Sequence, residues 1–179
     1  MIHLNNYGWN DKLSQLKQES TYNALTHGRI SIVHRTCYEV VSENGLFQCE
    51  LTGNMMYGKS DFELPCTGDW VLFQPFDEHK GIIVDMLPRE RTLYRKKNGT
   101  VADKQTIASY VDKAFIVQSL DDNFNVRRAE RFMVQMQEEH INPVLVFNKA
   151  DLRFDKQKVE EQIRHIARQI PVFFTSIHQ

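Results

Sequence analysis

The sequence predicts a mixed fold, in which a five-stranded OB-fold β-barrel is followed by an incomplete α/β domain. Short β-type runs separated by turn residues fill the chain up to residue 88. From residue 113 onward, apolar strand-like runs alternate with amphipathic helical segments, as in a parallel sheet with crossover helices. The composition is that of a folded protein, because 41% of the residues are hydrophobic and 25% are charged.

Five runs of strand-forming residues make up the predicted barrel: Arg29–His34, Tyr38–Ser42, Leu46–Leu51, Trp70–Phe76 and Gly81–Met86. Turn residues separate them, notably at positions 43–45 and 67–69. Several short strands in so short a segment favour closure, because a closed barrel has no exposed strand edge. The segment before them is expected to form a short helix or arm that packs on the barrel through Leu4, Trp9, Leu13 and Leu16.

The predicted α/β domain contains three apolar runs, at residues 114–117, 144–147 and 171–174. Between them, residues 126–140 place apolar side chains on one helical face, with Asn125 as the N-cap. Residues 156–168 repeat that pattern, with Asp155 as the cap. Three strands and two helices are half of such a domain, so we expect one sheet edge and one sheet face to be uncovered.

Charge and cysteine content narrow the class of protein. The formal net charge is −1, from 22 basic and 23 acidic residues, so only local clusters can indicate binding to nucleic acid. Cys37, Cys49 and Cys66 have no paired spacing, which is typical of a reducing cytoplasm. No apolar run reaches membrane length, and the first residues are too polar for a signal peptide. We expect a soluble cytoplasmic protein with no membrane partner.

The most informative motif is Asn148-Lys149-Ala150-Asp151, directly after the second α/β strand. In open α/β sheets, ligands bind beyond the carboxyl ends of the strands. There, Asp151 can accept hydrogen bonds from the ring N–H and the exocyclic amine of guanine, a pair that adenine does not present. Lys149 can lay its methylene stem over the purine face, and Asn148 can brace the loop or reach the base edge.

A second loop supports this interpretation. Thr175-Ser176-Ile177 follows the next strand, and its backbone N–H groups could donate to the guanine carbonyl. The alternative is a helix-capping loop, because Asn and Asp are common after strands. The strand-end context of both loops favours recognition of guanine.

The segment Gly53–Ser60 matches the Walker A pattern letter for letter. A phosphate-binding loop of that kind needs a strand before it and a helix that opens at its end. Only residues 61–64 separate Ser60 from Pro65, which leaves no room for a useful helix. Residues 61–147 also lack the Asp-x-x-Gly element of an unpermuted GTPase. We interpret the match as coincidental, with an unpermuted GTPase that uses this segment as the alternative.

Basic residues cluster between the two predicted domains, with Tyr94 among them. Such a pattern suits contact with RNA phosphates and with a stacked base, whereas the alternative is a solvated linker. The predicted RNA-binding residues of this cluster are Arg89, Arg91, Tyr94, Arg95, Lys96 and Lys97. Arg29 and Arg35 are included because they could extend the basic surface over the barrel.

The order of these motifs resembles the ribosome small subunit-dependent GTPase A family (RsgA). Its members join an OB-fold to a circularly permuted P-loop GTPase domain. The resemblance covers nearly the whole chain and is carried by Tyr7–Asn10, Gly28-Arg29, Pro65–Val71, Leu87–Arg89, Gln105–Ala108, Val111-Asp112, Arg131-Phe132 and Asn148–Leu152. It divides the chain into an arm (1–27), the barrel (28–88), a basic linker (89–112) and the start of the GTPase domain (113–179).

The resemblance implies a monomeric GTP hydrolase that binds the small ribosomal subunit and its rRNA late in subunit maturation. GTP or GDP with Mg²⁺ would be bound by the intact protein. Ile177 departs from the family, which has Ala there. The chain also ends at Gln179, before the family's P-loop, switches and Zn²⁺-binding carboxy-terminal domain.

We therefore expect this chain to contain no catalytic residue, no metal ligand and no tightly bound cofactor. On its own it should have negligible GTPase activity. An OB-fold RNA-binding module without nucleotide function is the alternative.

Overall fold

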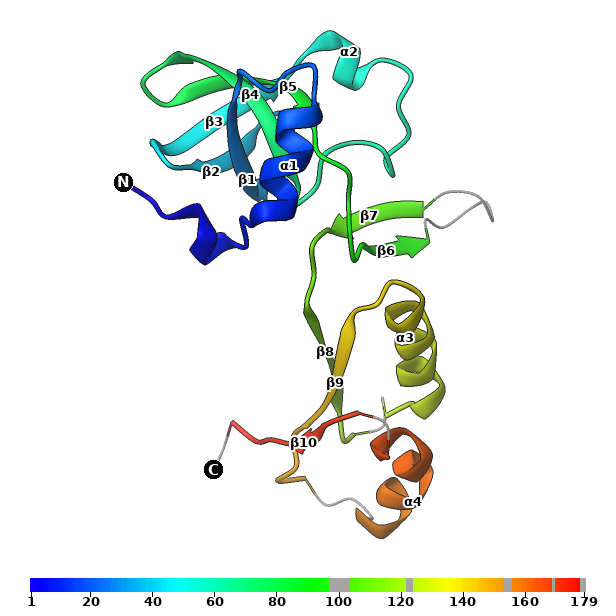
Figure 1. Ribbon diagram of the computed structural model, residues 1–179. Coiled ribbons are helices and arrows are strands. Elements are labelled where there is room, and N and C mark those ends of the chain that lie inside the picture. The colour runs from blue at the N-terminus through cyan, green and yellow to red at the C-terminus, as the bar shows by residue number, and fades with distance from the viewer. Residues whose placement is uncertain (97–103, 122–123, 153–155, 169, 178–179) are drawn as a thin grey trace. The chain divides into compact units, whose positions relative to one another are not determined.

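The computed structural model describes residues 1–96, 104–121, 124–152, 156–168 and 170–177 (Figure 1). It forms two compact units, Met1–Tyr110 and Val111–Gln179. No helix in the described part of the chain is long and apolar enough to cross a membrane.

Five strands form a closed barrel in the first unit (Figure 1). They are β1 (Thr26–Val33), β2 (Tyr38–Ser42), β3 (Gly45–Leu51), β4 (Trp70–Asp77) and β5 (Lys80–Met86). The order is β1-β2-β3-β5-β4, and β1 pairs with β4 to close the barrel. Only β3 and β5 run parallel. The predicted five-stranded barrel is confirmed, and the short helix α2 (Gly53–Met56) lies in the connection between β3 and β4.

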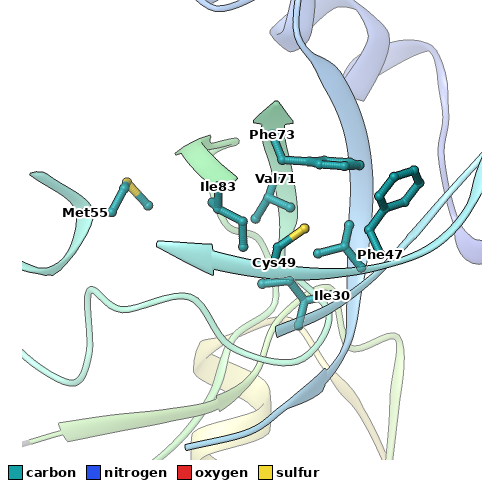
Figure 2. Close-up of a cluster of buried hydrophobic side chains, with 8 residues drawn as sticks. Ile30, Phe47, Cys49, Met55, Val71, Phe73 and Ile83 are labelled. Atoms are coloured by element: carbon teal, nitrogen blue, oxygen red, sulfur yellow. The ribbon is translucent and has the colours of Figure 1, made fainter. Parts of the chain in front are cut away.

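Alternating side chains of the strands fill the barrel interior. Figure 2 shows this cluster, which consists of Ile30, Val40, Phe47, Cys49, Val71, Phe73 and Ile83 from the strands and Met55 from α2. Gly28 in β1 is required for this packing, because a Cβ atom there would lie 2.5 Å from Val40 Cγ1 and 2.7 Å from the Val41 carbonyl oxygen. β1 and β2 therefore pack so closely at Gly28 that no side chain would fit there.

The amino-terminal segment packs on the outside of the barrel. It contains the 3₁₀ helix η1 (Leu4–Tyr7) and α1 (Asp11–Glu19), whose N-cap Asn10 accepts a hydrogen bond from Leu13 N at 3.1 Å. Its apolar residues join a second buried cluster, made of Leu4, Leu13, Val41, Trp70, Leu72, Leu87 and Tyr110. The predicted short helix is present, and its apolar face packs on the barrel as predicted.

The first unit also contains a two-stranded sheet that the sequence did not reveal. β6 (Leu93–Lys96) pairs antiparallel with β7 (Lys104–Ala108), within the segment expected to be a basic linker. An isolated bridge joins Thr67 to Ala108, and Ser109 N donates to the Thr67 carbonyl oxygen at 3.0 Å. These contacts attach the hairpin to the turn that precedes β4.

The second unit is a parallel sheet in the order β10-β9-β8. Its elements are β8 (Lys113–Ser119), α3 (Val126–Glu138), β9 (Asn142–Asn148), α4 (Lys156–Ala167) and β10 (Val172–Phe174). The Asn125 side chain caps α3 as predicted, since it accepts from Arg128 N at 3.2 Å. The predicted cap Asp155 lies outside the described residues.

Only one face of this sheet is covered by helices (Figure 1). The strand register places Phe115, Val117 and Phe173 on one face, where they are 65%, 61% and 55% exposed. The neighbouring positions Ile116 and Leu145 point to the other face and are buried. The expected uncovered face is therefore present in the described residues.

His27 belongs to β1, and its side chain contacts the amino-terminal segment. Its ring centroid is 4.1 Å from that of Trp9, and its Nδ1 is 3.3 Å from Lys17 Nζ. Burial lowers the pKa of the His27 imidazole below its ordinary value, and the Lys17 charge lowers it further, while Glu43 opposes the shift.

We predict that His27 makes the first unit less stable at acidic pH. Above about pH 6.5, folded and unfolded states both hold a neutral imidazole. As the pH falls below that value, the unfolded state binds a proton that the folded state resists, so the free energy of unfolding decreases. Urea unfolding at pH 7.5 and 5.5 should show a smaller difference in His27→Gln than in the parent chain. An unchanged difference in that variant would assign the pH dependence to other groups.

Candidate functional site

Three loops meet at one edge of the parallel sheet, because parallel strands end at the same side. They follow β8 at Leu120–Asp121, β9 at Asn148–Asp151 and β10 at Thr175–Ile177. β9 is the central strand, so its loop lies between the other two. Both sequence-predicted guanine loops are thus neighbours in the structure.

Backbone hydrogen bonds hold these loops together. Thr175 N donates to the Phe147 carbonyl oxygen at 2.8 Å, and Ala150 N donates to the Thr175 carbonyl oxygen at 3.0 Å. On the other side, Leu120 N donates to the Asn148 carbonyl oxygen at 3.0 Å. The loop after β9 is therefore fixed to both of its neighbours by main-chain contacts.

Two side-chain contacts join the β9 and β10 loops. The Ser176 hydroxyl donates to Asp151 Oδ1 at 2.5 Å, and the Thr175 hydroxyl donates to Asn148 Oδ1 at 3.4 Å. Asp151 is exposed, and Asn148 is half-buried. The carboxylate that the sequence singles out is accessible and is oriented by a residue of the second predicted loop.

The Lys149 side chain contacts the loop after β8, on the side of β9 opposite to β10. Its backbone has a φ of 62°, in the left-handed region, and its Nζ donates to Asp121 Oδ2 at 2.6 Å. Sequence reasoning did not single out Asp121. The strand-end rule that selected the other two loops could have found it, because Asp121 follows the first strand of the same sheet.

Ile177 and Ala150 complete the predicted set. Ile177 is 81% exposed, so its larger side chain has room in this structure, and Ala150 is half-buried.

The Walker-like segment has the wrong local structure for a phosphate loop. A helix begins at Gly53, where the pattern starts, and ends at Met56, before Lys59 and Ser60. The Ser60 backbone N–H and hydroxyl both donate to Glu63 Oε2, at 3.0 and 2.8 Å. Residues 61–63 form a turn, so no helix opens at Lys59–Ser60, as the sequence predicted.

Arg29 and Arg89, both predicted to bind RNA, donate to groups within the first unit. Arg29 donates to the carbonyl oxygens of Gly68, Tyr7 and Tyr110, and its guanidinium lies 5.8 Å from the Trp70 ring centroid.

Arg89 forms a buried ion pair with Asp69. Its NH2 lies 2.6 Å from Asp69 Oδ2, and the two side chains are 13% and 0% exposed. It also donates to the carbonyl oxygens of Phe62 and Leu64. Burial alone would lower the pKa of the Arg89 guanidinium, but the hydrogen bonds to Asp69 and its negative charge act in the opposite direction, and the net effect is a raised pKa. These contacts assign Arg89 a structural role in the first unit.

The other basic candidates lie nearer to solvent. Arg35 and Arg95 are exposed, and Arg91 and Tyr94 are half-buried. Arg95 donates to Gln105 Oε1 at 2.8 Å, and Lys104 Nζ lies 4.1 Å from the Tyr94 ring centroid. Lys96 belongs to β6, and Lys97 lies outside the described residues.

Comparison with known proteins identifies the family. The family model described as RsgA GTPase matches residues 86–179, which is more than half of the 179-residue chain. The chain belongs to the RsgA GTPase family. The family assignment agrees with the sequence resemblance.

Curated RsgA proteins match almost all of the chain. It is 70% identical over 177 residues to small ribosomal subunit biogenesis GTPase RsgA 1 of Bacteroides thetaiotaomicron, covering 99% of this chain and 50% of that protein. It is 33% identical to the RsgA protein of Methanosarcina acetivorans, covering 96% of this chain and 46% of that protein. The chain thus spans about half the length of these relatives.

Two solved structures have the same fold. YjeQ of Thermotoga maritima has a TM-score of 0.62 at 23% identity, covering 84% of this chain and 51% of that one. YloQ, described as a circularly permuted GTPase, has a TM-score of 0.59 at 23% identity, covering 90% of this chain and 55% of that one.

In this RsgA-family chain, the cysteines are placed as packing residues. Burial raises the pKa of the Cys49 and Cys66 thiols to about 12. Cys37 is half-buried. Within the described ranges, no group of three or more His, Cys, Asp and Glu side chains could hold a metal ion.

We predict that Arg89→Ala destabilises the first unit instead of only weakening ligand binding. It leaves the Asp69 carboxylate buried without its partner, which costs about 3–5 kcal/mol of unfolding free energy. Urea unfolding measures this loss. Arg95→Ala is the control, and it should change stability by less than about 0.5 kcal/mol, because Arg95 is exposed. Equal small effects of both substitutions would contradict the structural role of Arg89.

Proposed function

We propose that this chain supplies the guanine-recognition loops and the RNA-binding barrel of a GTPase in small ribosomal subunit biogenesis. The observation that carries this proposal is the placement of Asp151, oriented by Ser176 beside Lys149 at the carboxyl edge of the sheet. The names of the relatives, small ribosomal subunit biogenesis GTPase RsgA, support the biological role.

The chemistry of guanine selection follows from the Asp151 carboxylate. An ionised carboxylate can accept several hydrogen bonds at once, so the bond from Ser176 orients it without preventing others. Guanine offers a ring N–H and an amine on one edge, and a carboxylate accepts both. Adenine presents an acceptor at the corresponding ring nitrogen, so the pair would repel. The loop thereby selects the base.

Hydrolysis needs groups that the described residues do not bring to this edge. Mg²⁺ and phosphate-binding amides stabilise the charge of the transferring phosphoryl group in GTPases. The Walker-like segment opens no helix, and the Ser60 hydroxyl is bonded to Glu63. The described residues therefore do not fit Mg²⁺ or the phosphates. We propose that this chain reads the base and does not hydrolyse GTP on its own.

The barrel unit is the proposed RNA-binding part. OB-folds use their strand surfaces and loops to bind oligonucleotides. Arg35, in the loop between β1 and β2, and Arg95, in the β6–β7 hairpin, are exposed cations on this unit. The proposed partner is the rRNA of the small subunit, which the chain would bind as a monomer in the cytoplasm.

We predict that the chain binds fluorescent GDP weakly and in preference to the ADP analogue. Asp151→Asn should reduce that preference by about 10-fold or more, because charged hydrogen bonds to the base are lost. Lys59→Ala should leave GDP binding unchanged. Fluorescence anisotropy titrations of the three proteins provide the measurement.

Two results of that titration would count against the proposal. Tight GDP binding that is abolished by Lys59→Ala would favour an unpermuted GTPase that uses Gly53–Ser60. Binding of small subunits with no preference between GDP and ADP would favour an RNA-binding module without nucleotide function.

RNA binding has its own prediction. Arg35→Ala and Arg95→Ala should each weaken binding to small-subunit rRNA and lower the slope of log affinity against log salt by about 1. Arg164→Ala is the matched control, because Arg164 is an exposed arginine of α4 in the other unit. Filter binding across a salt series measures the slopes. Equal losses in all three variants would indicate nonspecific attraction without a barrel site.

A further inference from the structure

The ion pair between Lys149 and Asp121 joins two loops of the candidate site. Lys149 Nζ lies 2.6 Å from Asp121 Oδ2, and the two side chains are 50% and 22% exposed. Asp121 follows β8, whereas Lys149 follows β9, so the pair bridges neighbouring strand ends. The Leu120 N–H donates to the Asn148 carbonyl oxygen at 3.0 Å, which fixes the spacing of those two ends.

Both ends of the Lys149 side chain are constrained. At its base, the backbone φ of 62° lies in the left-handed region, which is unfavourable for a residue with a Cβ atom. At its tip, the ammonium is held by Asp121. A flexible lysine stem is thereby restricted to a narrow set of conformations, and strained backbone of this kind is concentrated at functional sites.

The two motif side chains on the β9 loop are directed to opposite neighbours. Asp151 contacts Ser176 after β10, and Lys149 contacts Asp121 after β8. Because β9 is the central strand, the lysine stem extends toward β8 along the sheet edge, away from the contact between Asp151 and Ser176. The base-reading carboxylate and an apolar methylene surface are thus held apart, on one loop.

We propose that Asp121 is a positioning residue of the guanine site. By holding the Lys149 ammonium, it fixes the methylene stem against which a purine ring packs. Asp121 therefore sets the affinity for purine rings without reading the base. This inference rests on the proposed function, since it assigns a task to Asp121 within the same guanine site.

The test is titration of the full 179-residue chain with GMP and with IMP, a nucleotide that lacks the exocyclic amine. Amide chemical shifts in NMR monitor the binding. Asp121→Asn should weaken binding of both nucleotides by about two- to fivefold, as expected for losing one partly exposed ion pair that orders the site. The ratio of the two affinities should stay as in the parent chain. Asp151→Asn should instead reduce that ratio, because it changes the group that reads the amine.

Further variants separate positioning from a general structural effect. The double variant Asp121→Asn, Lys149→Met should bind no more weakly than Lys149→Met alone, because Asp121 acts through Lys149. Glu130→Gln is the matched control, since it removes a carboxylate that pairs with His165 at 2.8 Å between α3 and α4. It should leave GMP binding unchanged. In the parent chain without ligand, the ion pair with Asp121 should slow the hydrogen exchange of the Lys149 ammonium, so that its NMR resonance is observed. In Asp121→Asn without ligand, that resonance should be lost.

The outcomes distinguish the inference from the function on which it rests. If the parent chain binds neither GMP nor IMP, the proposed guanine site is wrong, and the role of Asp121 is wrong with it. If the parent chain binds GMP and prefers it to IMP, but Asp121→Asn binds equally well, only the positioning role is overturned. An additive loss in the double variant, or an unchanged ammonium resonance, would also overturn it.

Discussion

The buried pair of Asp69 and Arg89 links three separate segments of the first unit. Asp69 accepts from Cys66 N at 2.8 Å and from Arg89, which follows β5 and in turn donates to the carbonyl oxygens of Phe62 and Leu64. A fully buried carboxylate is tolerated only when it is paired and hydrogen-bonded, so the chain around it has little freedom to rearrange. The turn residues after Ser60 are therefore held against the start of β4. In that turn Ser60 donates to Glu63, and no helix directly follows the Walker letters in the described residues.

In the second unit, the direction of the strands determines which loops lie next to one another. The three strands are parallel, so their carboxyl ends fall on one edge, and each contributes one polar loop. The central loop is tied to β10 through Ser176 and to β8 through Asp121. Recognition of a flat base needs a carboxylate in its plane and an apolar surface against its face. In the proposed guanine site, the two contacts of the central loop, to Ser176 and to Asp121, serve these two needs.

The sequence predicted those features of the fold that depend on interactions between residues close together in the chain. The turns fix the limits of β2, which match the prediction, and the Asn125 cap acts on Arg128, three residues away. Interactions between distant residues were not readable. The intramolecular partners of Arg29 and Arg89, both predicted to bind RNA, are carbonyl and carboxylate groups up to 81 residues away, which the sequence pattern did not indicate. The β6–β7 hairpin was missed for the same reason, since periodicity carries no information about pairing across a loop, whereas Asp121 was within reach of the strand-end rule that selected the other two loops.

The uncovered face of the parallel sheet is a second feature of the unit that carries the candidate site. Phe115 and Val117 of β8 and Phe173 of β10 expose apolar side chains on the same face, on either side of β9, and apolar patches on a sheet face usually mark an interaction site. The curated relatives are about twice as long as the region that this chain matches. The proposed base-reading loops are nevertheless already held together by hydrogen bonds among the loops that follow β8, β9 and β10. The proposed base selection therefore depends on contacts within this sheet, whereas the described residues of the sheet do not supply the phosphate contacts of a GTPase.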